Sequence, residues 1–578
     1  MSAQDRDFIA AVTSAADAEA GALLRAPGVA ELHSAPLGPH RAAMRRVKLL
    51  VAVHIAPGSR YTGDRVALSL ALEYAAALER MQAATGLFSG GDNVESPPDS
   101  GFTINDLGDT VELLRRVPAP RSHDLQQLER RLRAIATAAT PAMVAGGVHT
   151  PNHRWELAAA LARLHRLDGA ASSRTRALQW LAEGIDIDAD GQYSERSANY
   201  ATHVSNPSLL AIGDIFGRKD LHDIVERNLE SNLGLIHSDA TVETVHSRRQ
   251  DQKDLRFPLG ASALHYRRFA ISEDRGDFAW AAELAMTGAI MEPQTALADL
   301  LLDPRLGERM PTAVPPPVER RQTWSGSALV RDDSAKRSIL VYAGSDYSDM
   351  GRIRSGLANN PTFLRLFAGG LILDSVRLSR DFFGLGPFRA SSMVSEGEAL
   401  VLEEVVEGHY YLPMATERQQ QDGRYEVVDE GRFAAAMSFD QRETTAVSLA
   451  TRVTVTPLSD GVELDISVDG PATSWALELA FRDGGTFEGG SLDGGTFAGD
   501  GEDLSSNGVL LLRDGFARYR VGDRALVFGP GTGVDAAIRY RAGEDYEYLG
   551  GTDALSGPRA YIAGRGPGAH RLTIRATG

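Results

Sequence analysis

Apolar positions in the first part of the chain recur every three to four residues. Segments such as 5–26, 40–55 and 65–86 combine this spacing with a high content of Ala, Leu and Arg. The spacing puts apolar side chains on one face of a helix. It predicts helices over residues 5–26, 40–55, 65–86, 123–140, 152–167, 172–184, 219–236, 257–273 and 277–289.

Many amphipathic helices of similar length, joined by short connections, are typical of stacked antiparallel helical hairpins. Such hairpins form either an open solenoid or a ring, the (α/α) toroid. A regular solenoid requires an internal repeat, and the sequence shows no clear one. We therefore expect a toroid, whose central funnel can hold a ligand.

The period changes to two beyond the Pro-rich segment Pro311–Pro317. In residues 447–455 and again in 462–468, apolar and polar residues alternate, and Pro457–Gly461 lies between these runs as a turn. Alternation of this kind is that of a strand with one buried face. Short strands separated by Gly-rich turns predict a large antiparallel β-sandwich.

The chain is thus expected to be a multidomain protein, α first and β second. Residues 1–310 would form an incomplete (α/α) toroid that carries the chemistry, and residues 318–578 a large antiparallel β-sandwich, with a stiff Pro-rich linker between them. Twelve of the fourteen histidines precede the linker, the exceptions being His409 and His570. The usual proton-transfer groups are therefore concentrated in the helical part.

Composition narrows the function. Hydrophobic content of 43% and charged content of 24% are those of a soluble globular protein. The net charge of −17 argues against nucleic acid, whose phosphates are bound by clustered Lys and Arg. The basic residues are overwhelmingly Arg, which suits carboxylates, and an acidic chain can still line one groove with Arg.

Several classes of site are absent from the sequence. Without cysteine there is no disulfide, thiolate metal site or cysteine nucleophile. No dinucleotide fingerprint, Walker loop, calcium loop or His-Glu-x-x-His occurs, so no cofactor or metal is implied. No leader and no run of about eighteen apolar residues is visible. We expect a cytoplasmic protein that does not enter the membrane, or a secreted one if a leader was removed.

The segment His149–Trp155 is the first candidate site. Thr150 is a preferred N-cap and Pro151 suits the first helical position. Asn152 and His153 would then lie in the first turn of a helix, where free N–H groups attract an anion. A carboxylate bound there would make the neighbouring C–H more acidic. The structural alternative is an ordinary capped helix with solvent-facing polar residues.

The polar segment Asp190–Tyr200 is the second candidate. Tyr200 is close in sequence to Arg196 and His203, and cationic neighbours favour a phenolate. Tyr193 competes for the same role, and periodicity does not choose between the two. A structural hydrogen bond is the commoner fate of a buried Tyr.

Segment Val242–Gln250 is a polar stretch within the helical part. If it is extended, His246, Arg248 and Gln250 share one face and Arg249 lies on the other. Arg248 or Arg249 could then bind a carboxylate through two hydrogen bonds. A surface hairpin is the alternative.

A fourth candidate is the polar loop Asn93–Asp99, which is stiffened by two prolines. It is equally compatible with a substrate-binding loop and with a plain connection between helices.

These features together resemble heparinase II/III-type polysaccharide lyases. The resemblance is carried by the order of helical part and sandwich, by the Asn152-His153 pair, and by the pattern Asp190-Gly191…Glu195-Arg196-Ser197…Tyr200. It is specific in motif only around residues 149–206. Members of the family have a toroid followed by a sandwich and cleave uronic-acid glycans by β-elimination.

The resemblance implies roles for individual residues. Asn152 and His153 would neutralise the substrate carboxylate, and Tyr200 would act as base, acid or both. His246 would be the second proton-transfer group. No cofactor would be needed, because the carboxylate itself takes up the electrons. The substrate-binding residues would be His149, Arg154, Asn93, Asp99, Tyr193, Arg196, His203, Arg248 and Arg249.

The chain departs from the family in one respect. Many members place a functional histidine early in the sandwich, where this chain has Arg352–Asn360 and no histidine. The identity of the second catalytic group and the syn or anti course of the elimination therefore stay open.

Two other functions are compatible with the sequence. A glycoside hydrolase on the same scaffold would use paired carboxylates, and a non-catalytic protein would bind uronate glycans without cutting them. The expected partner in each case is a polysaccharide or oligosaccharide. The uronate, the linkage, endo or exo action, oligomeric state and any structural metal are left open. The carboxylates available to a hydrolase are Asp99, Asp186, Asp188, Asp190 and Glu195.

Overall fold

The chain forms two compact units in the computed structural model. The first comprises Met1–Val242 and Pro258–Pro316, and the second Glu243–Phe257 and Pro317–Gly578. The division after Pro316 lies within the Pro-rich linker, but the segment Glu243–Phe257, expected in the helical part, belongs to the second unit. The structure describes residues 4–35, 38–91, 93–253, 255–347, 356–489, 509–534 and 557–578.

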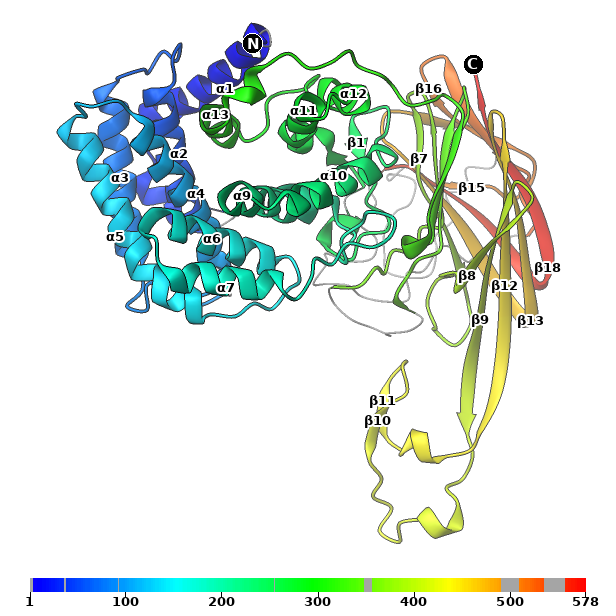
Figure 1. The fold of residues 1–578 in the computed structure, drawn as a ribbon. Helices are drawn as coiled ribbons and strands as arrows, with labels where there is room; N and C mark the ends of the chain where they lie inside the picture. The colour runs from blue at the N-terminus through cyan, green and yellow to red at the C-terminus, as the bar shows by residue number, and fades with distance from the viewer. Residues whose placement is uncertain are drawn as a thin grey trace. The chain divides into compact units, whose positions relative to one another are not determined.

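The first unit is a ring of helices (blue to green in Figure 1). Successive helices pack in a series, with α2 against α3 and α4, α4 against α6, and α6 against α7 and α9. The last helix, α13, packs against α1 and α2, so the series returns to its start, as in a toroid. The helices are α1 Arg6–Arg25, α2 Pro39–Ile55, α3 Arg65–Met81, α4 Pro97–Arg116, α5 His123–Ala145, α6 His153–Asp168, α7 Ala171–Leu181, α8 Ala198–Tyr200, α9 Asn206–Phe216, α10 Lys219–Leu233, α11 Ala263–Ser272, α12 Gly276–Ala285 and α13 Pro293–Leu302.

Helix α4 begins inside the segment that the sequence predicted to be a loop through Asp99. Pro97 and Pro98 suit a first helical turn, where backbone N–H groups have no partner within the helix. Ser96 caps the helix by accepting a hydrogen bond from the N–H of Asp99, 3.2 Å away. The loop prediction is therefore wrong from Pro97 onward.

The second unit is built on a sheet of fourteen described strands, all antiparallel except the pair β15–β18. One core contains Ile339 and Leu366 from strands near one end of the strand order and Tyr519 and Phe528 from strands near the other. The sheet therefore folds over itself as a sandwich, which confirms the expected fold class. The strands are β3 Arg320–Trp324, β4 Leu329–Asp333, β5 Ser338–Tyr342, β6 Leu364–Ala368, β7 Leu371–Arg380, β8 Ser392–Glu396, β9 Ala399–Tyr411, β12 Thr444–Leu458, β13 Gly461–Phe481, β14 Thr486–Glu488, β15 Val509–Leu511, β16 Ala517–Val521, β17 Arg524–Gly529 and β18 Arg559–Thr577; outside this sheet are β1 Thr241–Val242, β2 Phe257–Pro258, β10 Val427–Asp429 and β11 Ala434–Ala436.

The hairpin of β12 and β13 follows the alternating pattern of the sequence. The strands pair from Leu458 opposite Gly461, and Val455 lies opposite Leu464. The apolar residues from Leu449 to Val468 that alternate along both strands are buried. This prediction is confirmed because each strand turns one face to the core.

Three neighbouring strands also bury charge. Arg377 of β7, Glu478 of β13 and Tyr561 of β18 lie side by side in the strand register. Arg377 Nε donates to Glu478 Oε1 at 2.9 Å, and the Tyr561 hydroxyl donates to Glu478 Oε2 at 2.7 Å. Each of the three is buried and each has a partner, as a stable interior requires.

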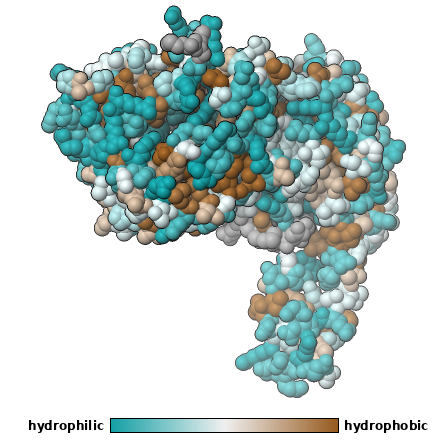
Figure 2. Space-filling view, in the orientation of Figure 1, coloured by the Kyte–Doolittle hydropathy of each residue, from teal (hydrophilic) through white to brown (hydrophobic). Residues whose placement is uncertain are grey.

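The connection between β9 and β12 forms an arm that carries β10 and β11 (Figure 1). Large apolar side chains on it are exposed, among them Val427 and Phe433, and brown patches mark the arm in Figure 2.

Candidate active site in the helical unit

The tip of α6 carries the predicted amide and imidazole. The helix begins at His153, and Asn152, just before it, already has helical backbone angles and no capping hydrogen bond from its side chain. The Asn152 Nδ2 instead donates to Glu195 Oε2 at 2.6 Å, and both side chains are buried. This contact joins the tip of α6 to the segment that leads to Tyr200.

His153 is also buried, between two aromatic rings. Its ring meets Phe102 edge-on at 6.4 Å between centroids and His149 at 4.9 Å. His149 itself is exposed.

Arg154 lies on another side of the helix. Its guanidinium pairs with Glu183 at 3.1 Å and with Asp186 at 3.3 Å, and it stacks over the ring of Trp155. These contacts join α6 to the end of α7 and the segment after it. The role predicted for Arg154 in substrate binding is untested.

The two candidate tyrosines have different surroundings. Tyr193 is buried, and its hydroxyl donates to Asn206 Oδ1 at 2.8 Å. Burial and the nearby charge of Asp186 raise the pKa of Tyr193 far above its ordinary value, so its phenolate is disfavoured. Tyr200 is only partly buried and lines a cavity. Of the two, Tyr200 is placed to meet a ligand.

Tyr200 lies at an irregular point in its helix. The three-residue turn α8 is followed by a π-helical turn over Ala201–Ser205 and then by α9, with the N–H of Asn206 bonded to the carbonyl of Ala201. A π turn inside a helix is rare and is often found at a functional site. Just before it, Arg196 has a left-handed backbone with φ of 50°, and its N–H donates to the carbonyl of Tyr193.

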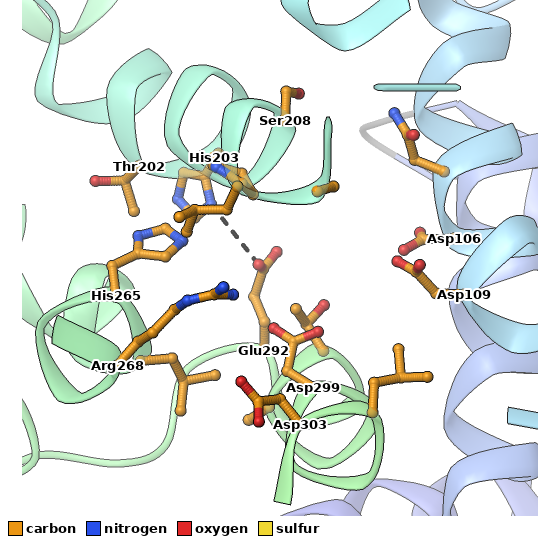
Figure 3. A pocket seen from close by; sticks show the side chains of 18 of the residues that line it. Asp106, Asp109, Thr202, His203, Ser208, His265, Arg268, Glu292, Asp299 and Asp303 are labelled. Atoms are coloured by element: carbon orange, nitrogen blue, oxygen red, sulfur yellow. Dashed lines mark ion pairs between the residues drawn. The ribbon is translucent and has the colours of Figure 1, made fainter. Parts of the chain in front are cut away.

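The cavity has a volume of about 1140 Å³ and lies within the helical unit (Figure 3). Side chains of α1, α2, α4, α6, α9, α11 and α13 line it together with the π turn. Of the residues predicted from the sequence, Tyr200 and His203 are in its wall. Glu156, one helical turn beyond Asn152 on α6, lines it as well.

Two carboxyl groups of the cavity hold their protons unusually well. Glu156 accepts hydrogen bonds from Asn105 at 2.6 Å and from Ser208 at 3.3 Å, and burial raises its pKa to about 7. Burial likewise raises the pKa of Asp299 to about 6, against the opposing charge of Lys48. Carboxyl groups of this kind in a cavity are candidates for acid–base chemistry.

Lys48 lies buried in the same wall. Its Nζ contacts Asp106 Oδ1 at 2.9 Å. Burial alone would lower the pKa of Lys48, but the charges of Asp106, Asp109 and Asp299 outweigh it and raise that pKa. The lining therefore mixes carboxylates with cations rather than presenting one sign of charge.

His203 is paired with Glu292, the residue that precedes α13. The distance from His203 Nδ1 to Glu292 Oε2 is 3.7 Å (dashed in Figure 3), and Glu292 Oε1 also pairs with Arg45 at 2.8 Å. An imidazole beside a carboxylate is a common acid–base arrangement.

The residues of the former loop segment are divided. Asn93 is exposed. Asp99 is buried in the first turn of α4 and pairs with Arg41, whose guanidinium lies over the ring of Phe102 at 3.7 Å. Arg41 and Phe102 line the cavity, so Asp99 acts on its wall through Arg41.

The extended conformation considered for Val242–Gln250 does not continue beyond Val242. The chain turns at Thr244–Ser247, where the N–H of Ser247 bonds to the carbonyl of Thr244 at 2.9 Å. Glu243 stabilises this turn because its Oε1 accepts from the N–H groups of Thr244 and Val245. The face that His246, Arg248 and Gln250 were expected to share therefore does not form.

Within the second unit, His246 is buried in that turn. Arg248 donates two hydrogen bonds, of 2.8 and 2.7 Å, to the two oxygens of Asp346. The N–H of Arg249 donates to Ser247 Oγ at 3.0 Å. The guanidinium of Arg248, one of the two expected to hold a substrate carboxylate, is thus paired with a carboxylate of the chain itself; the role predicted for Arg249 stays a prediction. Of the stretch expected to replace the family histidine, Arg352–Arg354 lie outside the described residues.

Three residues of the site were not predicted in these roles. Glu195 was part of the family motif but was given a role only as a hydrolase carboxylate, and Glu156 and Glu292 were not considered. The sequence held one signal for Glu156: it follows Asn152 by four residues, so the two lie on the same face of a helix. The Glu292-Pro293 pair was another, because Pro favours the first position of a helix.

The described part of the chain contains no group of three or more His, Asp or Glu arranged to hold a metal ion. In the same part, no helix has the length and apolarity that crossing a membrane requires.

Solved structures share the architecture of both units. The chain aligns with the chondroitin AC lyase of Streptomyces coelicolor A3, in complex with chondroitin sulphate, with a TM-score of 0.57 and 14% identity over 98% of this chain and 79% of that chain. A mutant of heparan sulfate lyase HepC from Pedobacter heparinus aligns with a TM-score of 0.50 and 10% identity, over 93% of this chain and 76% of that chain. A Paenibacillus xanthan lyase aligns with a TM-score of 0.53 and 10% identity, over 93% of this chain and 53% of that chain.

At these identities the likeness is one of fold, and it confirms the resemblance to polysaccharide lyases at that level. No family model matches the sequence, and no curated protein matches it.

Proposed function

We propose that the protein is a polysaccharide lyase that cleaves a 4-O-linked uronic-acid glycan by β-elimination and leaves a 4,5-unsaturated uronate end. The toroid and sandwich shared with lyases of chondroitin, heparan sulfate and xanthan support the class of enzyme. The substrate would be a uronate-containing polysaccharide or oligosaccharide.

Tyr200 would be the base that removes the proton from C5. The observation that carries this role is its position in the wall of the cavity, on the segment that Glu195 joins to Asn152. Asn152 and His153 would neutralise the substrate carboxylate, which takes up the negative charge that develops at C5. Glu195 would orient the amide, because its Oε2 accepts the hydrogen bond that Nδ2 donates. His246 is a further proton-transfer candidate from the resemblance.

A panel of uronate glycans tests the proposal. Chondroitin, heparan, xanthan-type, alginate and gum oligosaccharides are incubated with the protein, and absorbance in the near ultraviolet reports the new double bond. Tyr200→Phe should lower turnover by about 10²–10⁴-fold with the fold intact, because general acid–base groups contribute that much. His246→Gln in the same assay decides whether His246 takes part. Near-normal turnover of Tyr200→Phe removes that residue from the mechanism.

A glycoside hydrolase is the second candidate, favoured by the raised pKa values of Glu156 and Asp299 in one cavity. Hydrolysis uses one protonated and one ionised carboxyl group. It would release reducing ends without any rise in ultraviolet absorbance, and Glu156→Gln or Asp299→Asn would abolish that release.

A further inference from the structure

Helix α2 presents two guanidinium groups to the cavity of the helical unit. Arg41 and Arg45 are four residues apart on this helix, a spacing that puts them on one face, and both line the cavity. The side chain of Arg41 is 17% exposed and that of Arg45 is 36% exposed, so a ligand in the cavity can reach both. This face of α2 is therefore a basic strip in the cavity wall.

Arg41 is held in place by two contacts. One of its Nη nitrogens pairs with Asp99, and its guanidinium carbon lies over the ring of Phe102, 3.7 Å from the ring centroid. The described residues offer Arg41 no other hydrogen bond, and its Nε is buried without a partner. A buried donor that lacks an acceptor costs free energy. A ligand that brings acceptor oxygens to Arg41 would recover part of that cost.

Arg45 also gives a single nitrogen to its partner. Its Nη2 pairs with Glu292 Oε1 at 2.8 Å, and it forms no other hydrogen bond or ion pair with the residues that the structure describes. Glu292 precedes α13 (labelled in Figure 3), so the contact ties Arg45 to a distant segment of the chain. The other two nitrogens of Arg45, Nη1 and Nε, are left for a ligand.

Two other arginines of the cavity wall show the contrast. Arg163 donates hydrogen bonds of 2.8 Å to both oxygens of Asp109. Arg268 donates bonds of 3.0 and 2.6 Å to the two oxygens of Asp214. In both cases a carboxylate of the chain occupies the planar fork of the guanidinium. The two arginines of α2 differ, because each gives one nitrogen to its carboxylate.

Phe102 connects the basic strip to the candidate site. Its ring, which lies under Arg41, also meets the ring of His153 at 6.4 Å between centroids. His153 and Asn152 are the groups proposed to neutralise the carboxylate of the uronate that is cut. Arg41 lies beside them, so it suits an acidic group on an adjacent sugar.

Charge and geometry indicate the kind of ligand. Asp99 and Glu292 offset the positive charges of Arg41 and Arg45, so directed N–H donors rather than excess charge would attract it. A guanidinium fork donates two parallel hydrogen bonds to a group that presents two acceptor oxygens. A carboxylate and a sulfate ester both do so, whereas a sugar hydroxyl group does not.

We propose that Arg41 and Arg45 form a subsite that binds a second acidic group of the glycan, a carboxylate or a sulfate ester on a sugar next to the uronate that is cut. This inference rests on the proposed lyase function. The subsite takes no part in breaking bonds. It selects glycans in which an acidic group stands next to the reacting uronate.

Four variants test the subsite. Arg41→Gln and Arg45→Gln each remove one guanidinium, and Arg41→Lys keeps the charge but not the fork. Arg46→Gln is the matched control, because it removes the same charge from the same helix outside the cavity lining. The Arg46 guanidinium instead bonds to the carbonyl of Gly28 at 3.1 Å and to the hydroxyl of Tyr74 at 3.2 Å.

Circular dichroism and thermal unfolding establish that each variant folds. Arg41→Gln leaves the buried carboxyl group of Asp99 without its guanidinium partner. If that variant does not fold, the double variant Arg41→Gln, Asp99→Asn removes the stranded carboxyl group and takes its place.

The kinetic readout is kcat and KM for a glycan that gives the ultraviolet-absorbing product. Arg41→Gln and Arg45→Gln should each raise KM by about 10–100-fold, because a hydrogen bond to a charged group contributes that much to binding. The kcat should stay near the wild-type value, since the subsite binds ground state and transition state alike.

The remaining two variants sharpen this result. Arg41→Lys should recover only part of the affinity, because an ammonium group lacks the planar fork. Arg46→Gln should match the wild type. Wild-type KM in both Arg41→Gln and Arg45→Gln overturns the proposal.

Binding of short saccharides distinguishes the two acidic groups. Calorimetry in the Tyr200→Phe background uses chondroitin tetrasaccharides with and without a sulfate ester, and a disaccharide with one uronate. If the subsite binds the sulfate ester, Arg41→Gln weakens binding of the sulfated tetrasaccharide alone. If it binds the carboxylate of a neighbouring uronate, both tetrasaccharides bind more weakly and the disaccharide does not. Equal weakening of the disaccharide assigns Arg41 to the uronate that is cut and overturns the proposal.

The same titrations separate the subsite from the reaction. If no glycan of the panel yields an unsaturated product, the lyase function fails. Weaker binding of a tetrasaccharide to Arg41→Gln than to the wild type then keeps the subsite, as that of a glycan-binding protein. A wild type that binds none of these saccharides, or binds them as the variants do, contradicts the subsite as well.

Discussion

The two units bury carboxylates in contrasting surroundings. In the sheet, Glu478 receives hydrogen bonds from a guanidinium, that of Arg377, and from the hydroxyl of Tyr561. In the helical unit, the partners of Glu156 are an amide and a hydroxyl, from Asn105 and Ser208, and the group lies in the wall of a cavity.

This difference decides what each carboxyl group can do. A carboxylate bonded to a guanidinium ties neighbouring strands together. A carboxyl group with neutral partners is disfavoured as an anion by burial and so holds its proton up to neutral pH. Burial of charge therefore does not mark a site by itself, whereas a carboxyl group with neutral hydrogen-bonding partners beside a cavity is a candidate.

The largest effect is expected from breaking the pair in the sheet. Arg377→Met leaves the buried carboxyl group of Glu478 without its guanidinium partner, which should lower the free energy of unfolding by about 3–5 kcal/mol. Denaturant unfolding of the intact chain measures it. Adding Glu478→Gln to Arg377→Met removes the stranded carboxyl group and should recover most of the loss. A single variant as stable as the wild type would mean that the pair is not the stabilising contact.

For Glu156 the expected effect is a dependence of the free energy of unfolding on pH. Its pKa of about 7 in the folded state is above the ordinary 4.5, so between these values the folded protein holds a proton that the unfolded chain has lost. Stability should therefore fall as pH rises through this window, by on the order of 3 kcal/mol, and level off above it.

Glu156→Gln removes this titration. The variant and the wild type should be equally stable near pH 4, and the variant should be the more stable near pH 8. Thermal and denaturant unfolding across this range provide the measurement. Parallel stability curves for the two proteins would show that Glu156 is not protonated as the cavity suggests.

A smaller effect sharpens the same contrast within the helical unit. Tyr193→Phe removes the donor to Asn206, so it should lower the free energy of unfolding by about 1–3 kcal/mol and leave kcat unchanged. Tyr200→Phe should lower kcat and leave the free energy of unfolding unchanged. Stability and turnover measured on both variants assign the structural and the catalytic tyrosine, and equal losses of turnover would leave the assignment unsupported.

Elements with a long, regular period were predictable. Helix α6 and the hairpin of β12 and β13 were expected close to where they lie. Their apolar residues recur every 3.6 residues in the helix and every two residues in the strands. Helices α4, α9 and α13 were missed. In α4, two prolines and two glycines obscure the helical pattern, although proline is well suited to a first turn.

The candidate site was predictable only in part. The sequence predicted that Asn152, His153 and the phenol of Tyr200 converge on one ligand, and this stays a prediction. The structure shows that Asn152 is bonded to Glu195, five residues before Tyr200. The turn at Thr244–Ser247 was not foreseeable. Glu243 stabilises it, and the other carboxylate oxygen of Glu243 is bonded to Arg365, a residue of β6. A contact between residues so far apart in the chain leaves no periodic pattern in the local sequence.

What the sequence by itself determined is the order of a helical and a β unit and the residue types that chemistry could use, since both follow from local periodicity and composition. Only the tertiary structure decided that Tyr193 is buried against Asn206 while Tyr200 meets a cavity, and that His203 faces Glu292. Solvation and charge at a side chain are set by groups distant in the chain, and packing alone brings those groups together.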